Sequence, residues 1–374
     1  MKQILPVVIF FSLSAIATPI LQMNKALMAL TELLPFITDE ASFKEKKHEK
    51  KISESMQELE AAFRSAKHDK LIKSDLFAPS YAVITEELGE AGRAFKNQKK
   101  DFAHWRLKEI TSHCLDCHSR LPEEVASSFQ TGDLQLDKTL FENPYNLGVA
   151  QLIVRRAVDA KWTFTKVIDE SFVKKDFRDL KRSLKQLLLI DVKFLKNPGN
   201  LIPPLKEYLT KENLPNEEAE MIKAWIPRLE AWEKKKILEK GLKSEAQVKE
   251  LISQELMPLR KKSSLTDAES VDLLAASGLL SNYFYAHPKS TLAPELNFWL
   301  GWSEKFLKRD LFFGSGDYFL KQCVRRYPQS KMAKDCYEEY EESVNFDFSG
   351  SSGTNIPEDV QAQLNELKRL MKKK

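Results

Sequence analysis

The sequence predicts an all-α protein, with an N-terminal antiparallel four-helix bundle followed by a solenoid of helical hairpins. Three observations lead to this prediction. Glycine is scarce, at 12 of 374 residues, and no stretch alternates apolar and polar side chains convincingly as a strand would. Apolar residues recur instead at helical spacing along most of the chain. Near the C-terminus a pattern also repeats with a period of 40 residues, so that Pro288 corresponds to Pro328. Such a repeat is typical of stacked helical hairpins.

Residues 1–17 have the pattern of a secretory signal peptide. Lys2 precedes an apolar run over residues 4–16, and residues 15–17 form a small-x-small cleavage site. The apolar run is too short to span a bilayer as a helix, and no cysteine near the cleavage point provides a lipid anchor. We therefore expect a soluble, exported, periplasmic protein that makes no membrane contact after cleavage.

Residues 18–125 are expected to form the four-helix bundle. Apolar side chains three or four positions apart mark one face of each helix. Proline is accepted near the start of a helix, and it disfavours helix in the residue before it. Short connections between neighbouring helices favour an antiparallel arrangement. The four helices are expected at about 21–37, at about 43–68, after Ala78-Pro79, and from about Lys100 to Leu121-Pro122.

The fourth of these helices carries Cys114, Cys117 and His118 in a C-x-x-C-H sequence. Positions i, i+3 and i+4 of a helix lie on one face, so two thiols and one imidazole can converge on one macrocycle. This is the attachment sequence of a c-type haem. Cys114 and Cys117 would form thioethers with the haem vinyl groups, and His118 would be the proximal ligand of the iron. The competing interpretations are a dithiol redox pair and half of a zinc site.

A four-helix bundle with C-x-x-C-H near the end of its last helix resembles the cytochrome c′ and cytochrome c556 group of class II cytochromes c. The resemblance covers roughly residues 20–122, and only Cys114, Cys117 and His118 carry over from the family pattern. It implies one covalent haem, with five-coordinate iron or with methionine as sixth ligand. It also implies electron transfer, or binding of a small gas such as NO.

The sixth iron ligand is expected from the end of the bundle where the motif lies. In an up-down-up-down bundle the start of the first helix and the end of the second helix meet there. His68 is therefore the first candidate for the distal ligand and Met23 the second, and a site without a protein ligand is the third possibility. For His68 the competing interpretation is a C-cap, where an imidazole favours the helix dipole. Met56 lies about 18 Å from His68, at about 1.5 Å per residue, and is expected in the core.

Other polar side chains near the motif are expected to have ordinary roles. His48 and His104 are expected in solvent, and His113 is expected to point about a quarter turn away from Cys114. Arg106 lies two turns before Cys114 and could pair with a haem propionate, although a solvated surface arginine is the favoured interpretation.

Residues 126–345 are expected to be helical and to end in the 40-residue repeat. Aligning Pro288 with Pro328 brings other positions into register, among them Ala293 with Ala333. Each copy consists of a helix, a turn and a second helix. This resembles tetratricopeptide-type repeats, whose period is typically about 34 residues. The resemblance implies a concave groove for a protein partner, and the alternative is that the repeat serves packing alone.

Cys323 and Cys336 flank the turn of the last hairpin and are expected to form a disulfide in an oxidising compartment. Free buried thiols are the alternative. Residues 346–374 are expected to form a flexible loop, at Ser349 to Gly353, and a C-terminal helix that packs on the repeat domain.

Several function classes are not supported by the sequence. A formal net charge of +4 without a basic stripe argues against nucleic-acid binding. No Ser/His/Asp set, phosphate loop or carboxylate cluster indicates an enzyme. We expect an exported monohaem c-type cytochrome that transfers electrons or senses redox state and binds a redox partner protein through its helical repeats. The alternatives are haem-based binding of a small gas at a vacant distal site, and a structural scaffold or interaction module.

Overall fold

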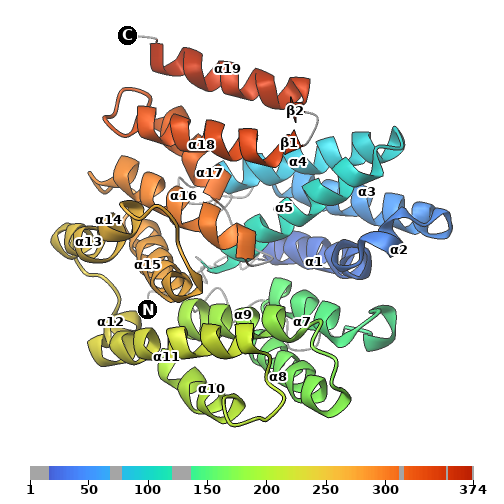
Figure 1. The fold of residues 1–374 in the computed structure, drawn as a ribbon. Coiled ribbons are helices and arrows are strands. Elements are labelled where there is room, and N and C mark those ends of the chain that lie inside the picture. Colours follow the sequence, from blue (N-terminus) through green and yellow to red (C-terminus); the bar gives the residue numbers. More distant parts are fainter. Residues whose placement is uncertain (1–16, 68–77, 120–135, 311–315, 351–352, 373–374) are drawn as a thin grey trace, which may run out of the picture. The chain divides into compact units, whose positions relative to one another are not determined.

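The computed structural model describes residues 17–67, 78–119, 136–310, 316–350 and 353–372 (Figure 1). For residues 17–23, 78–79, 116–119, 308–310 and 359 it describes the backbone alone. The chain divides into two compact units, one with residues 1–106 and 122–135 and the other with residues 107–121 and 136–374. The predicted signal peptide lies outside the described residues, apart from the backbone of Ala17.

The described helices of the first unit pack around one apolar core. Its elements are α1 (Ala17–Thr38), α2 (Glu40–Lys44), α3 (Glu49–Ala66), α4 (Ala78–Lys96) and the first turns of α5 (Lys100–Ser119). α3 packs against both α1 and α4. Their apolar stripes meet in this core, where the side chains that are at most 1% exposed include Leu33, Leu34, Ile52 and Leu59.

The second predicted helix begins later than expected. Instead of one helix from Phe43, the chain forms α2, a 3-10 turn at Lys46–His48, and then α3. Asp39 caps α2, because its carboxylate accepts a hydrogen bond from the amide of Ala41 at 3.0 Å. The short helix buries Phe43 completely, with its ring centroid 5.3 Å from that of Phe95.

The boundary between the two units falls within α5, between Arg106 and Leu107. The part of α5 that carries the C-x-x-C-H sequence therefore belongs to the second unit. The further helices of this unit are α7 (Pro144–Ile153), α8 (Ala157–Lys174), α9 (Leu180–Leu189), α10 (Ile202–Tyr208), α11 (Asn216–Lys235), α12 (Ile237–Lys240), α13 (Glu245–Leu251), α14 (Met257–Arg260), α15 (Asp267–Ala286), α16 (Ala293–Asp310), α17 (Gly316–Arg326), α18 (Ala333–Asp347) and α19 (Glu358–Lys372).

The two copies of the 40-residue repeat form two helical hairpins, α15–α16 and α17–α18. Their turns have the same backbone hydrogen bonds. In the first turn the amides of Ser290 and Ala293 donate to carbonyl oxygens three residues earlier, at 3.0 and 3.1 Å. Ser330 and Ala333 do the same in the second turn, at 2.9 and 3.2 Å. The sequence repeat thus corresponds to a repeated local structure.

Two glycines let α16 and α17 approach closely. A β-carbon on Gly316 would come within 2.6 Å of the backbone nitrogen of Lys305 and 2.9 Å of the carbonyl oxygen of Gly301. Backbone atoms cannot move aside as the end of a flexible side chain can, so only glycine fits at this position without a shift of the helices.

Gly316→Ala is expected to lower the free energy of unfolding by about 3 kcal/mol, because the extra methyl group overpacks this contact. Gly92→Ala in α4 is the control. The described structure leaves open space for a β-carbon there, so this variant is expected to gain about 0.8 kcal/mol from helix propensity. Urea unfolding of the full chain measures both, and equal effects of the two variants would contradict the close packing at Gly316.

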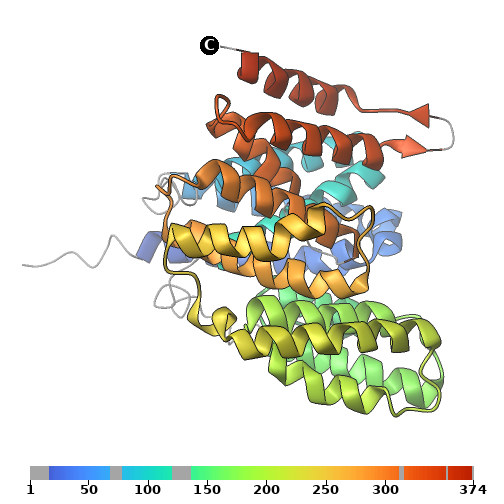
Figure 2. The same cartoon turned by 60° about the vertical axis from the view of Figure 1, so that its left-hand side comes forward.

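The described residues of the predicted flexible loop, Ser349, Gly350 and Gly353, lie in two short strands. Strands β1 (Ser349–Gly350) and β2 (Gly353–Thr354) pair antiparallel, with Ser349 opposite Thr354. They lead from α18 into α19, as Figure 2 shows. α19 packs against α17 and α18, as predicted for the C-terminal helix, and it buries the apolar side chains of Val360, Leu364 and Leu367.

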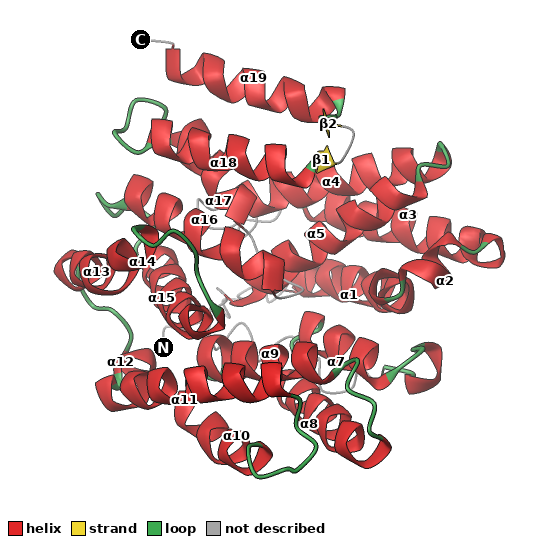
Figure 3. Ribbon diagram, in the orientation of Figure 1, coloured by secondary structure: helices red, strands yellow, loops and turns green. Residues whose placement is uncertain are grey.

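The all-α prediction is confirmed for the described part of the chain. Apart from the two short strands, its regular secondary structure is helical (Figure 3). None of the described helices combines the length and the apolarity that crossing a bilayer requires.

Candidate functional site

The C-x-x-C-H sequence lies on α5, which continues as one helix from Lys100 to Ser119. At about 100° per residue, positions 114, 117 and 118 fall within about 100° of arc on one face of this helix. The side chain of Cys114 is buried, with 6% exposed. The side chains of Cys117 and His118 lie outside the described residues, so the structure places only their backbone.

The helix turn that leads into the motif is enclosed by protein. Six consecutive residues, from Ile110 to Leu115, are each at most 6% exposed. Six consecutive residues of an α-helix point in all directions around its axis, so no side of this turn faces solvent. A group attached to Cys114 would start from a water-poor environment with apolar side chains from Ile110 and Leu115.

His113 packs against the second hairpin of the repeat. Its ring lies edge-on to the ring of Tyr318, with centroids 5.4 Å apart and planes inclined by 62°. Both residues are buried, and Tyr318 belongs to the first turn of α17. The sequence analysis missed Tyr318, because no motif marks it and its contact with α5 spans about 200 residues of chain.

The prediction that His104 is solvated is wrong. His104 is 6% exposed, and its Nε2 donates a hydrogen bond to the carbonyl oxygen of Ile37 at 3.0 Å. The centroid of its ring lies 5.0 Å from that of the Phe43 ring. Burial of the imidazole is possible because the carbonyl replaces a lost water partner. His48, also predicted in solvent, is only partly exposed and lies 4.9 Å from the ring of Phe36.

The expectation of a solvated Arg106 is also wrong. Arg106 is 5% exposed, and its Nη2 lies 2.8 Å from Glu90 Oε2, with Glu87 Oε1 3.9 Å from Nη1. The guanidinium also lies over the ring of Trp105, at 4.6 Å from its centroid. The positive charge of Arg106 is therefore matched by two carboxylates of α4 within the first unit.

The side chains of both candidates for the distal ligand lie outside the described residues. His68 lies outside the described residues, and Met23 is described by its backbone in α1 alone. Met56 is 4% exposed on the buried face of α3, where the sequence analysis expected it. Within the described ranges, no group of three or more His, Cys, Asp or Glu side chains is arranged to hold a metal ion.

The backbone of α5 places positions 114, 117 and 118 on one face of a continuous helix, and the side chain of Cys114 is buried. A covalent haem would need its two thioether sulfurs and its iron ligand on one face in this way. Such a site would keep water from a bound haem, and burial is one of the means by which a protein sets the potential of haem iron.

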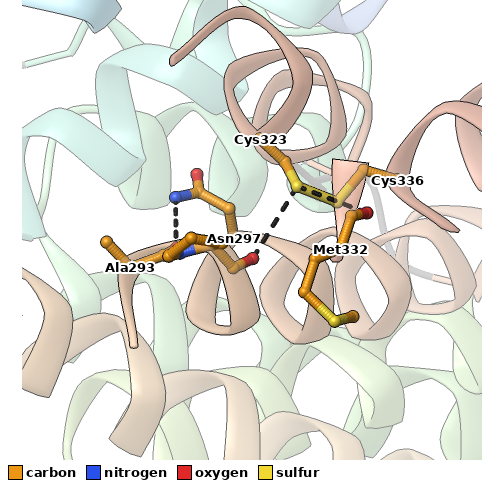
Figure 4. The surroundings of a disulfide bond; sticks show 6 residues. Ala293, Asn297, Cys323, Met332 and Cys336 are labelled. Atoms are coloured by element: carbon orange, nitrogen blue, oxygen red, sulfur yellow. Dashed lines mark hydrogen bonds between the residues drawn. A yellow bond between two sulfur atoms is a disulfide. The ribbon is translucent and has the colours of Figure 1, made fainter. Parts of the chain in front are cut away.

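A disulfide joins the two helices of the last hairpin. The sulfur atoms of Cys323 and Cys336 are 2.05 Å apart, and both residues are fully buried. Figure 4 shows the bond beside α16, with Cys323 Sγ 3.7 Å from the carbonyl oxygen of Pro294 and 3.8 Å from that of Met332. The bond links α17 to α18 across the turn that connects the two helices.

Removal of this disulfide is expected to lower the free energy of unfolding by about 3 kcal/mol, the loop-closure value for so short a loop. The variant is Cys323→Ala with Cys336→Ala, which avoids leaving an unpaired thiol. Urea unfolding compares it with the wild-type chain, in the presence and absence of a thiol reductant. Reductant should destabilise only the wild type, and an equal response of both proteins would contradict the bond.

The candidate site is therefore defined by its own residues, since no protein-family model, curated protein or solved structure matches the chain.

Proposed function

We propose that the protein is an exported c-type cytochrome in which Cys114 and Cys117 hold one haem covalently and His118 binds its iron. The observation that carries the proposal is the C-x-x-C-H sequence on an uninterrupted stretch of α5. The signal-peptide pattern of residues 1–17 supports it, because haem is attached to this sequence outside the bacterial cytoplasm.

Each residue of the motif has a distinct task in this proposal. When bound, the haem supplies reversible one-electron chemistry at its iron. Cys114 and Cys117, one helical turn apart, fix the ring relative to α5 at two points. His118 supplies an imidazole nitrogen as proximal ligand. The buried turn from Ile110 to Leu115 limits access of water, which influences the potential at which the iron accepts an electron.

We further propose that residues 18–125 form the four-helix bundle of class II cytochromes c, with the C-x-x-C-H sequence on its last helix. Contacts between its helices support this arrangement. α3 packs against α1 and α4, while His104 of α5 binds a carbonyl of α1 and Arg106 of α5 pairs with α4. The hairpins α15–α16 and α17–α18 would then be tetratricopeptide-like repeats that bind a redox partner protein in the periplasm, and the protein would be an electron carrier or redox sensor, not an enzyme.

The test is a visible absorption spectrum of the mature protein, expressed together with a haem-attachment system. A sharp α band on reduction, and haem that stays with the protein after acid–acetone extraction, are the expected results. Addition of CO then separates the two modes of action. A six-coordinate electron carrier should respond weakly, whereas a spectrum that shifts readily would favour gas binding at a vacant distal site. Absence of covalent haem despite competent attachment machinery would overturn the proposal.

A further inference from the structure

The haem-attachment segment is held by the repeat hairpin that follows much later in the chain. Residues 107–119 of α5 belong to the same compact unit as α17. Within this unit His113 and Tyr318 form a buried edge-to-face ring pair. Edge-to-face pairs are directional, because the positive edge of one ring meets the negative face of the other. The contact therefore constrains how the α5 turn is rotated about its axis.

His113 lies next to the face that carries the motif. Position 113 is about 40° around the helix from position 117, at about 100° per residue. A side chain that packs on His113 therefore lies beside the helix face of positions 114, 117 and 118, which we call the attachment face. Rotation of α5 about its axis would move His113 and the attachment face together.

Tyr318 belongs to a helix that is held at several points. At its first residue, Gly316, α17 contacts the backbone of α16 too closely for any larger residue. In its second half the Cys323–Cys336 disulfide ties it to α18, and Arg325 Nη2 forms an ion pair with Glu366 Oε2 of α19 at 3.1 Å. Tyr318 is therefore presented to His113 from a fixed support.

We propose that Tyr318 is a positioning residue, which sets the reduction potential of the haem through its contact with His113. The inference rests on the proposed function. It gives the repeat domain a second task besides partner binding, because a change in α17 would alter the haem through one ring contact.

The experiment is a spectroscopic redox titration of the full haem-loaded chain. Tyr318→Leu removes the ring and should change the ratio of reduced to oxidised haem, at a fixed solution potential, by threefold or more. At about 59 mV per tenfold this is about 28 mV. Tyr318→Phe retains a ring and should recover at least half of the change. His113→Leu, which removes the other ring, should act in the same direction as Tyr318→Leu.

The matched control is Tyr283→Leu. Tyr283 is 4% exposed and forms another tyrosine–histidine ring pair of this unit, with the ring of His287 at 4.2 Å, but at the end of α15. Its removal should leave the potential unchanged. A shift of the same size in this variant, or no shift in Tyr318→Leu and His113→Leu, overturns the inference.

A second readout does not depend on haem. Thermal unfolding of Tyr318→Leu, His113→Leu and the double variant should show a smaller loss for the double variant than the sum of the single losses. Additive losses would mean that the two rings do not interact, and would overturn the inference. If the wild type carries no covalent haem, the proposed function fails. If it carries haem but the variants leave the potential unchanged, only the role of Tyr318 fails.

Discussion

Simultaneous replacement of Cys114 and Cys117 by alanine is expected to remove all covalently bound haem from the protein. Thioether bonds to these two sulfurs are the only covalent links that the motif offers, and a haem held by His118 alone would dissociate in acid. The measurement is acid–acetone extraction, followed by haem staining of the protein after denaturing electrophoresis. The wild type should keep its haem through both steps, and the double variant should lose it completely.

The Cys323→Ala, Cys336→Ala variant is the matched control for this loss. It also removes two cysteines, but ones that the structure joins in a disulfide in the last hairpin. It should retain covalent haem at the wild-type level. If this control lost its haem while the motif variant kept it, the assignment of the attachment site to α5 would be wrong. Loss of haem from both variants would indicate a folding defect, which far-ultraviolet circular dichroism would reveal.

Arg106→Met is expected to lower the free energy of unfolding by about 4 kcal/mol. Removing one partner of a buried ion pair leaves the other charge without compensation in a poorly solvated place. Glu87 is 6% exposed, and the side chain of Glu90 is 15% exposed, so water cannot replace the guanidinium fully. Methionine retains much of the volume of the arginine stem. The loss of unfolding free energy therefore reflects the removed charge more than a new cavity.

Arg64→Met is the control for this prediction. Arg64 also pairs with a glutamate, Glu60, with 2.6 Å between Nη2 and Oε1, but its side chain is 66% exposed. An exposed pair of this spacing contributes about 0.3–0.5 kcal/mol. Urea unfolding of both variants should therefore separate them by several kilocalories per mole. Similar losses would show that burial of Arg106 does not determine its contribution.

Features that depend on short-range patterns could be predicted from the sequence alone. Helical periodicity predicted the all-α class, and the repeat around Pro288 and Pro328 predicted two hairpins whose turns share their hydrogen bonds. The position of the C-x-x-C-H sequence on a helix could also be predicted, because helix geometry alone relates positions i, i+3 and i+4. These patterns depend on short stretches of sequence, so they can be recognised without knowledge of the rest of the chain.

The placement of polar side chains and the contacts between distant helices depend on the tertiary structure. Burial of His104 and Arg106 depends on a carbonyl in α1 and carboxylates in α4, and no local pattern specifies which polar side chain meets a partner in the interior. The second predicted helix is likewise divided at Glu45, whose extended backbone separates α2 from the 3-10 turn before α3. The contact of His113 with Tyr318 joins segments about 200 residues apart. Packing between distant helices depends on the sum of many weak contacts, and these contacts exist only in the folded chain.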